Sequence, residues 1–439
     1  MNARVEPPPL SIADPLTGIV TWSADLEIER SDPDVFVTVA QSGNLVGYGL
    51  PEQATANGSG AGLTREAARR AAVGESAERY ACAFVHPEDL TLASYSELHG
   101  AGTAAVPPER WALFTGEQYE TSRYTGFADD TSIAWTAADN LTSGGRTLVP
   151  ASLVHMPYPR QFADRGEQIV AEAVSTGTAC APIRAEAIMG GLCEVIERDA
   201  FMIVWRNRLS RPRIVIDEAS GLLETFGSRF DRPWLDYRLW YTTLDLSVPA
   251  CFGLLRDKRH SPARTVVGGA CHPDPARAVL KTLLELTQGL QWMAHARNRE
   301  RRSFPSFDDV RTFEDRMHLY AFGGLDEAFG FLDRDGGRVR LSAIPSLAAP
   351  NPGAAVDRCC EAVEQAALEP LAVDLTSADL EACGLFVVKV LIPECVPMEG
   401  DHRLPFLGGD RWRDVPVRLG LRHSPTPLHA INPFPHPYP

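Results

Sequence analysis

Two segments of the chain carry the same acidic pattern, a glutamate followed three residues later by a Glu-Arg pair. The residues are Glu75, Glu78 and Arg79 in the first copy, and Glu194, Glu197 and Arg198 in the second. A third segment has Glu285 with Gln288 three residues later. Side chains three apart on a helix lie on one face, so each pair would direct two carboxyl groups to the same place.

Two interpretations of these glutamates remain open on the residues alone. In the first, they lie on the solvated face of an amphipathic helix and pair with the adjacent arginines. In the second, they are partly buried and need cations to ionise together, and Mg²⁺ prefers such hard carboxylate oxygens. The repetition of the pattern favours the second interpretation. Four or five facing glutamates carry more charge than one Mg²⁺ neutralises, which indicates two or more ions.

The charge of the whole chain restricts its partners. The 439 residues carry a formal net charge of −15 at pH 7, which argues against binding to nucleic acid or to an anionic membrane. The sequence contains no GxxxxGK[ST] phosphate loop and no HExxH zinc motif. A phosphate ligand would therefore be held by Mg²⁺ and by local Arg or Lys side chains. No apolar run is long enough to span a membrane, and the first 18 residues lack the charged-then-apolar pattern of a signal peptide, so we expect a cytoplasmic, bacterial protein.

The elements that position the glutamates are predicted to be helices, each preceded by a small-residue loop. The expected loops are 57–64, 175–182 and 266–275, and the expected helices are 65–85, 185–205 and 276–296. Strands are expected at 18–22, 34–40 and 385–392, and one more helix near 354–368. The fold class is therefore mixed α and β, or α+β, with internally repeated sheet-plus-helix units around a central site.

The expected domain organisation is simple. Residues 1–45 form an N-terminal extended segment that packs on the core, and residues 46–439 form one domain that includes the tail 432–439. Residues 300–350 are charged and are expected to form a surface excursion.

The tail, Asn432–Pro439, has a proline at every second position from Pro433. Proline fixes φ at about −65° and favours an extended path with little entropy left to lose. Such a tail can be held in a groove at a low ordering cost, although a rigid tail without a function is the alternative.

Taken together, these segments resemble the YcaO family of ATP-dependent backbone-modifying proteins. Residues 58–80 resemble the first ATP/Mg motif of the family, residues 175–201 the second, with its final Glu-x-x-Glu-Arg-Asp-Ala, and residues 268–288 the third. The Pro-x-Pro-x-Pro ending at 435–439 resembles that of the azoline-forming branch. The chain departs from the family pattern at Ala61, Ala71 and Thr176, where Lys, Ser and Asn are common.

The resemblance implies three sets of site residues. The Mg²⁺ ligands would be Glu75, Glu78, Glu194, Glu197 and Glu285. The nucleotide contacts would be Glu186, Arg79, Arg198, Lys281, Gln288 and Gly60, with Lys281 also explicable as a surface lysine. The prolines Pro435, Pro437 and Pro439 would bring the carboxylate of Pro439 to the active site, where it organises or assists proton transfer.

The resemblance also implies the chemistry. The cofactors would be ATP and Mg²⁺, and the reaction would be cyclodehydration of Cys, Ser or Thr in a ribosomally synthesised precursor peptide to thiazoline or (methyl)oxazoline. The side chain attacks the preceding backbone carbonyl, and phosphorylation of the resulting hemiorthoamide oxygen converts it into a good leaving group. Products of this type include thiazole/oxazole-modified microcins and other antibiotics.

The expected partners follow from where the motifs begin. Because they start before residue 60, we expect a stand-alone cyclodehydratase that needs a separate leader-binding, E1-like or RRE partner protein. A flavin-dependent azoline dehydrogenase acting afterwards and a homodimeric assembly are further expectations. Two alternatives remain: formation of a thioamide or amidine with the same ATP site, and a non-catalytic scaffold that binds peptide.

Overall fold

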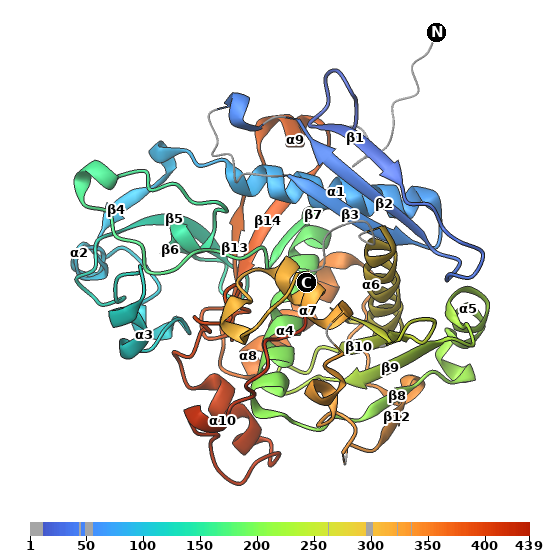
Figure 1. The fold of residues 1–439 in the computed structure, drawn as a ribbon. Coiled ribbons are helices and arrows are strands. Elements are labelled where there is room, and N and C mark those ends of the chain that lie inside the picture. Colours follow the sequence, from blue (N-terminus) through green and yellow to red (C-terminus); the bar gives the residue numbers. More distant parts are fainter. Residues whose placement is uncertain are drawn as a thin grey trace.

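The computed structural model describes residues 12–43, 45–48, 56–261, 263–295, 302–322, 324–334 and 336–439. Its strands form three sheets, and helix α4 (Arg184–Asn207) crosses the middle of the molecule between two of them (Figure 1). The tail ends near the centre of this view, whereas the N-terminal sheet lies at the top.

The first sheet has the order β1-β2-β3, formed by Val20–Asp25, Phe36–Ser42 and Asn57–Gly62. The second has the order β11-β10-β9-β8-β12, formed by Arg264–Cys271, Ala250–Asp257, Leu235–Tyr241, Arg213–Val215 and Arg338–Arg340. The third has the order β4-β5-β13-β14-β7, formed by Thr91–Ala93, Ile133–Asn140, Leu371–Asp374, Phe386–Leu391 and Thr178–Ala181, and β6 (Arg146–Pro150) pairs with β5. Among the described pairs, β8 and β12 are parallel and the others antiparallel.

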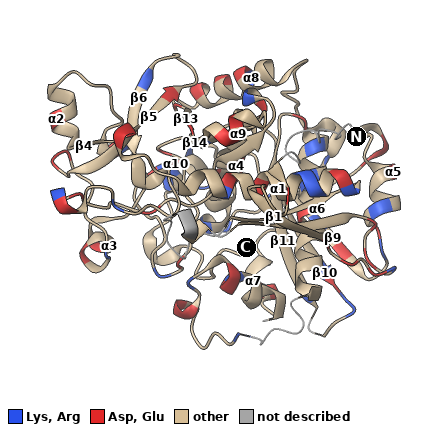
Figure 2. Cartoon of the chain, turned by 90° about the horizontal axis from the view of Figure 1, so that it is seen from above, with Lys and Arg blue, Asp and Glu red and all other residues tan. Residues whose placement is uncertain are grey.

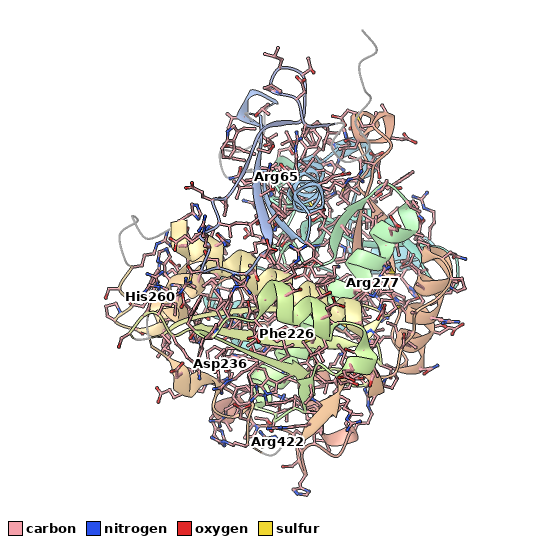
Figure 3. All side chains as sticks on the ribbon, turned by 90° about the vertical axis from the view of Figure 1, so that its right-hand side faces the viewer. Arg65, Phe226, Asp236, His260, Arg277 and Arg422 are labelled. Carbon is pink, nitrogen blue, oxygen red and sulfur yellow. The ribbon has the colours of Figure 1, made fainter. Side chains whose placement is uncertain are left out.

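The remaining α-helices are α1 (Arg65–Ala83), α2 (Tyr95–Gly100), α3 (Gly116–Thr121), α5 (Leu223–Thr225), α6 (Pro275–His295), α7 (Phe313–Phe322), α8 (Pro352–Gln365), α9 (Ala378–Ala382) and α10 (Arg411–Arg418). α1 begins after Thr64, whose side chain accepts a hydrogen bond from the backbone N–H of Ala67 and so caps the helix. In the segment after α5, Phe226 packs edge-on against Tyr237 of β9, with ring centroids 5.7 Å apart, on the side of the molecule where Figure 3 labels Phe226 and Asp236.

The structure corrects the three expected loops. They overlap strands β3, β7 and β11, and each strand leads into a glutamate-bearing helix, α1, α4 or α6. A Cβ at Gly58 would lie 2.1 Å from the carbonyl oxygen of Ala72, and a Cβ at Gly60 would lie 2.5 Å from the backbone nitrogen of Ala72. The small residues of β3 therefore reflect a close approach of strand to helix rather than a loop.

Helix α4 is the centre of the core. One side packs against β14, β7 and α8, and another against β11 and β10. Phe201 and Trp205 belong to a cluster with Trp240 and Phe252 of the second sheet, whereas Leu192 belongs to a cluster with residues of β14. A helix that is buried on most sides is apolar around most of its circumference, so the glutamates that α4 carries are exceptional.

The N-terminal strands expected from the sequence are present as β1 and β2. β1 pairs with β2, and β2 pairs with β3 across the expected boundary between 1–45 and 46–439, and that boundary stays a prediction. Residues 1–11 of the expected N-terminal segment lie outside the described residues. No helix in the described ranges is both long and apolar enough to span a membrane.

The expected surface excursion at 300–350 is wrong for α7. The side chain of Arg316 is fully buried and donates hydrogen bonds to the carbonyl oxygens of Thr312 and Gly400. His318 of the same helix is also buried. The charged composition of this segment therefore comes partly from polar side chains that are buried inside the protein.

Candidate functional site: a carboxylate cluster shared by three helices

The three strand-helix units hold their first glutamate in the same way. The backbone N–H of Ser59 donates to Glu75 Oε2 at 2.8 Å, that of Gly177 to Glu194 Oε2 at 2.9 Å, and that of Gly269 to Glu285 Oε2 at 3.0 Å. Donor and acceptor are 16, 17 and 16 residues apart in these three bonds. The internal repeat therefore extends to the third unit, and in each one a backbone donor fixes a carboxylate.

The second glutamates differ between the copies. Glu78 Oε1 accepts a hydrogen bond from the backbone N–H of Cys180 in β7, at 2.9 Å, so α1 is tied to the strand that precedes α4. Glu197 Oε1, in contrast, has no hydrogen-bond partner among the described residues, although the residue is only 5% exposed.

Contacts and electrostatics indicate that the three units face one site. Gln288 Nε2 of α6 donates to Ser59 Oγ of β3 at 2.6 Å. Burial, together with the negative charges of Glu75 and Glu194, raises the pKa of Glu78 to about 8. Burial also raises the pKa of Glu197 to about 8, opposed by Arg198 and assisted by Glu285 and Glu194. Figure 2 shows red segments beside α1, α4 and α6 near the middle of the molecule.

Two arginines offset part of this charge. Arg79 donates to Glu75 Oε1 at 3.2 Å. Arg198 lies 3.6 Å from Glu194 Oε1 and 3.4 Å from Glu197 Oε1, and its Nε has no hydrogen-bond partner among the described residues. Burial raises the pKa of Glu285, and the positive charge of Lys281 opposes this rise. Lys281 itself is exposed on α6.

The residues fit a site for Mg²⁺ and phosphate. Five carboxylates outnumber the neighbouring cations, and a buried carboxylate oxygen without a partner is costly unless a ligand satisfies it. Within the described ranges, no three His, Cys, Asp or Glu side chains already surround a single metal position. Mg²⁺ takes one or two carboxylates together with phosphate oxygens and water.

Glu186 and Gly60 are the remaining expected nucleotide contacts. Glu186 is half-buried in the first turn of α4. Gly60 lies in β3, where its lack of a side chain is explained by the approach of α1. Their roles toward a nucleotide stay predictions.

The tail reaches the same place. Pro435, His436, Pro437 and Tyr438 are buried, and Pro439 is exposed. The centroid of the Tyr438 ring lies 4.2 Å from the guanidinium carbon of Arg198. The tail is therefore packed against the second Glu-x-x-Glu-Arg copy.

Sequence reasoning missed Lys389. Its Nζ is buried in β14 and donates to the carbonyl oxygens of Val174 and Thr176, at 2.5 and 2.7 Å. Burial lowers the pKa of Lys389 to about 8. These bonds hold the segment before Gly177, whose N–H binds Glu194. The sequence did offer one signal for Lys389, because it is the single lysine within the apolar strand expected at 385–392.

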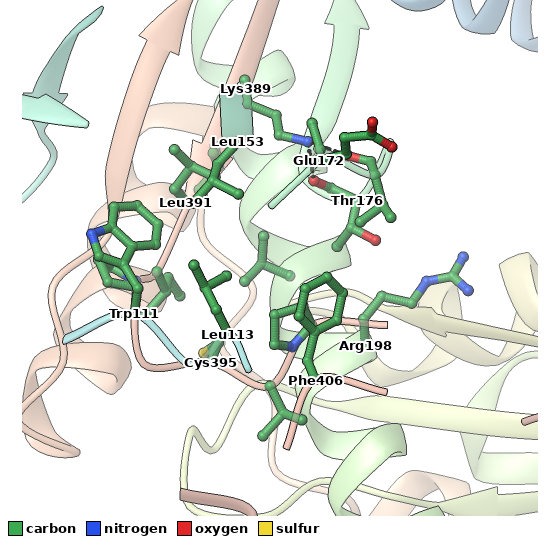
Figure 4. Close-up of a pocket in the computed structure, with 18 residues that line it drawn as sticks. Trp111, Leu113, Leu153, Glu172, Thr176, Arg198, Lys389, Leu391, Cys395 and Phe406 are labelled. Atoms are coloured by element: carbon green, nitrogen blue, oxygen red, sulfur yellow. Dashed lines mark hydrogen bonds between the residues drawn. The ribbon is translucent and has the colours of Figure 1, made fainter. Parts of the chain in front are cut away.

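An apolar pocket borders the carboxylates (Figure 4). Its cavity volume is about 90 Å³, and its larger apolar side chains are Trp111, Leu113, Leu153, Leu391 and Phe406. Thr176 and Arg198 also line it, so the pocket and the carboxylate cluster share a wall.

A protein-family model matches residues 59–396, and the family is described as YcaO cyclodehydratase, binding ATP and Mg²⁺. This chain belongs to the YcaO family. The expected family and the expected cofactors, ATP and Mg²⁺, are thereby confirmed.

Two curated relatives of this YcaO protein come from Rhizobium leguminosarum bv. trifolii and Methanothermobacter thermautotrophicus. They are 29% and 30% identical over 242 and 246 residues, and both are described as uncharacterised proteins. The matches cover 52% and 54% of this chain and 53% and 58% of the relatives, so the chain spans about half the length of the curated relatives it matches.

Two solved structures are similar to this YcaO protein. A heterocyclase in complex with substrate and cofactor is 26% identical, covers 98% of this chain and 56% of its own, and gives a TM-score of 0.76. YcaO from Methanopyrus kandleri, bound with AMPPCP and Mg²⁺, is 21% identical, covers 88% of both chains and gives a TM-score of 0.60. The expected mixed α and β fold of the YcaO type is therefore confirmed.

Proposed function

We propose that this YcaO protein is an ATP-dependent cyclodehydratase that converts Cys, Ser or Thr residues of a ribosomally synthesised peptide into thiazoline or (methyl)oxazoline. The observation that carries the proposal is the meeting of the alternating-proline tail with the carboxylate cluster at Arg198. A cluster of this kind suits phosphate bound with Mg²⁺, and the tail is the element that resembles the azoline-forming branch.

Each set of site residues has a proposed task. Glu75, Glu78, Glu194, Glu197 and Glu285 hold Mg²⁺, and Glu186, Arg79, Arg198, Lys281, Gln288 and Gly60 border the nucleotide. Bound ATP supplies the phosphoryl group that makes the former amide oxygen a good leaving group. The backbone N–H donors keep three of the carboxylates in place before any ligand arrives, so little reorganisation is needed when charge develops.

The peptide is proposed to lie across the apolar pocket. The pocket shares Arg198 and Thr176 with the carboxylate cluster, so a side chain bound there would place the neighbouring amide beside the phosphate. Water would be displaced from that amide by the walls of Trp111 and Phe406, which favours intramolecular attack.

Pro435, Pro437 and Pro439 are proposed to complete the active site. Pro435 and Pro437 are buried and fix the direction of the tail, and Pro439 follows Tyr438 at the exposed end. The tail would organise the groups that take a proton from the attacking side chain and return one to nitrogen.

The proposed partners are the precursor peptide and a leader-binding, E1-like or RRE protein, with a flavin-dependent azoline dehydrogenase acting on the product. The structure of a microcin synthetase complex from E. coli, McbBCD, has a related fold at 16% identity and a TM-score of 0.56. That likeness concerns the fold, and the partners of the present chain rest on the proposed reaction.

The test is mass spectrometry of a full-length precursor incubated with ATP, Mg²⁺, the leader-binding partner and the protein. We expect the loss of one water per ring in the wild type and none in Glu78→Gln. The matched control is Glu66→Gln on the same helix, because Glu66 forms an exposed pair with Arg70 that contributes little.

If the mass of the peptide instead shows that sulfur has replaced oxygen, the reaction is thioamide formation and the cyclodehydratase proposal is wrong. Absence of nucleotide binding in wild type and variants alike, measured by calorimetry, would support the non-catalytic scaffold instead.

A further inference from the structure

The tail contains residues other than proline, and one of them, Tyr438, contacts Arg198. We propose that Tyr438 is a positioning residue that holds the guanidinium of Arg198 beside Glu194 and Glu197, ready for the phosphates of a nucleotide. The inference rests on the proposed function. It assigns the main contribution of the tail to an aromatic side chain, with the prolines serving to deliver it.

Among the described residues, the guanidinium of Arg198 makes one weak hydrogen bond, from Nη1 to the sulfur of Met398, and none to a carboxylate. Its nitrogens lie 3.4 Å and 3.6 Å from the oxygens of Glu197 and Glu194, and Nη1 lies 3.6 Å from the sulfur of Met398. Hydrogen bonds between a guanidinium and a carboxylate are ordinarily about 2.7–2.9 Å long. The ion pairs therefore leave the plane of the guanidinium free to turn.

The ring of Tyr438 supplies what the carboxylates do not. Its centroid is 4.2 Å from the guanidinium carbon of Arg198, well within the range of about 6 Å for a cation–π interaction. The ring is itself held at an edge-on angle by Phe201, at 4.5 Å between centroids, and lies 5.9 Å from Phe252. A rigid, buried ring over a cation restricts both its position and its tilt.

The hydroxyl group of Tyr438 also lies in the site, next to Gly269. A Cβ at Gly269 would lie 2.0 Å from the Tyr438 hydroxyl oxygen and 3.1 Å from Glu197 Oε1. The same Gly269 donates its N–H to Glu285. A glycine at this position therefore leaves room for the tyrosine while its backbone holds the carboxylate of the third unit.

Four contacts upstream fix where Tyr438 falls. Asn432 N–H donates to the carbonyl of Arg206, Trp205 Nε1 donates to the carbonyl of Phe434, and Tyr320 donates to that of Pro435. Burial holds the pKa of His436 well below its ordinary value, so the neutral ring donates from Nε2 to the carbonyl of Glu399. Because proline has no N–H, the tail beyond Asn432 is anchored through the carbonyls of Phe434 and Pro435 and the side chain of His436.

The experiment compares Tyr438→Phe, which keeps the ring, with Tyr438→Leu, which removes it. Calorimetric titration with AMPPCP and Mg²⁺ should give a dissociation constant within about threefold of wild type for Phe and about 10- to 30-fold weaker for Leu. In the Arg198→Met background, Tyr438→Leu should cause no further loss, because the cation that the ring contacts is already gone. Tyr320→Phe is the matched control, since it weakens an anchor of the tail without touching Arg198.

A second readout does not depend on nucleotide. In protein labelled with ¹⁵N-arginine, the Nε–H resonance of Arg198 should be displaced by the ring current in wild type and Tyr438→Phe, and should lose that displacement in Tyr438→Leu. Thermal melting identifies any variant that fails to fold.

The inference is overturned if Tyr438→Phe and Tyr438→Leu bind nucleotide alike, or if the losses from Tyr438→Leu and Arg198→Met multiply. A wild type that displays the shifted Arg198 resonance but binds no nucleotide would overturn the proposed function together with the positioning role. The two failures are thus distinguishable.

Discussion

The two Glu-x-x-Glu-Arg copies have the same residues but different surroundings. On α1, both glutamates accept backbone hydrogen bonds and Arg79 forms a hydrogen bond with Glu75. On α4, Glu197 Oε1 and Arg198 Nε have no such partner among the described residues, and an aromatic ring covers the arginine. The protein therefore supplies hydrogen-bond partners to both glutamates of the α1 copy. In the α4 copy, it leaves polar atoms of Glu197 and Arg198 for a ligand to bind.

The largest expected effect tests this asymmetry directly. Glu197→Gln should lower ring formation by more than about 100-fold, because it alters a proposed metal ligand whose Oε1 has no hydrogen-bond partner among the described residues. Glu75→Gln should lower it less, since Glu75 is held by Ser59 and Arg79 on the satisfied side. Steady-state rates measured by mass spectrometry decide the order, and equal losses would remove the distinction between the copies.

A smaller effect is expected at Lys389. Lys389→Met leaves the carbonyl oxygens of Val174 and Thr176 without their donor, at a cost of about 1–3 kcal/mol per buried group. The loosened segment should weaken AMPPCP binding about tenfold through Gly177 and Glu194. Lys258→Met is the control, because Lys258 is largely exposed and should change stability by less than about 0.5 kcal/mol.

If Lys389→Met melts at a lower temperature but binds AMPPCP with unchanged affinity, the lysine stabilises β14 without supporting the α4 copy.

The glycines of β3 separate packing from ligand contact. Gly60→Ala should destabilise the protein by about 1–3 kcal/mol, as expected for overpacking against α1. Gly74→Ala, on α1 with no atom near the added Cβ, should instead stabilise the helix by about 0.5–1 kcal/mol. Chemical denaturation measures both. A loss of AMPPCP affinity in Gly60→Ala that exceeds its loss of stability would assign Gly60 to the nucleotide after all.

The smallest effect is a pH dependence shared by both copies. The pKa of Glu78 and of Glu197 is about 8, raised from 4.5. The folded protein therefore binds more protons than the unfolded chain between these pH values, so its stability falls as pH rises through about 8. Melting temperatures without Mg²⁺ should decline from pH 6 to pH 9. Mg²⁺ with AMPPCP should cancel the decline, and a flat profile in the absence of Mg²⁺ would contradict the burial of these carboxylates.

The sequence predicted the helices, their glutamates and the family because spacing along a helix fixes which side chains share a face. It misassigned β3 as a loop, since the glycines of a strand pressed on α1 have the same composition as a turn. It predicted α7 to lie on the surface because charged residue types are usually exposed, whereas Arg316 and His318 are buried. It could not find Tyr438, because nothing in the tail shows which residue meets Arg198, 240 positions earlier.

The most direct test of the account is a crystal structure of the protein with Mg²⁺ and AMPPCP. We predict Mg²⁺ between the phosphates and glutamates of α1, α4 and α6, with an ion or its water on Glu197 Oε1 and Arg198 still beneath Tyr438. Nucleotide bound elsewhere, or glutamates that keep their present contacts with no metal, would contradict it.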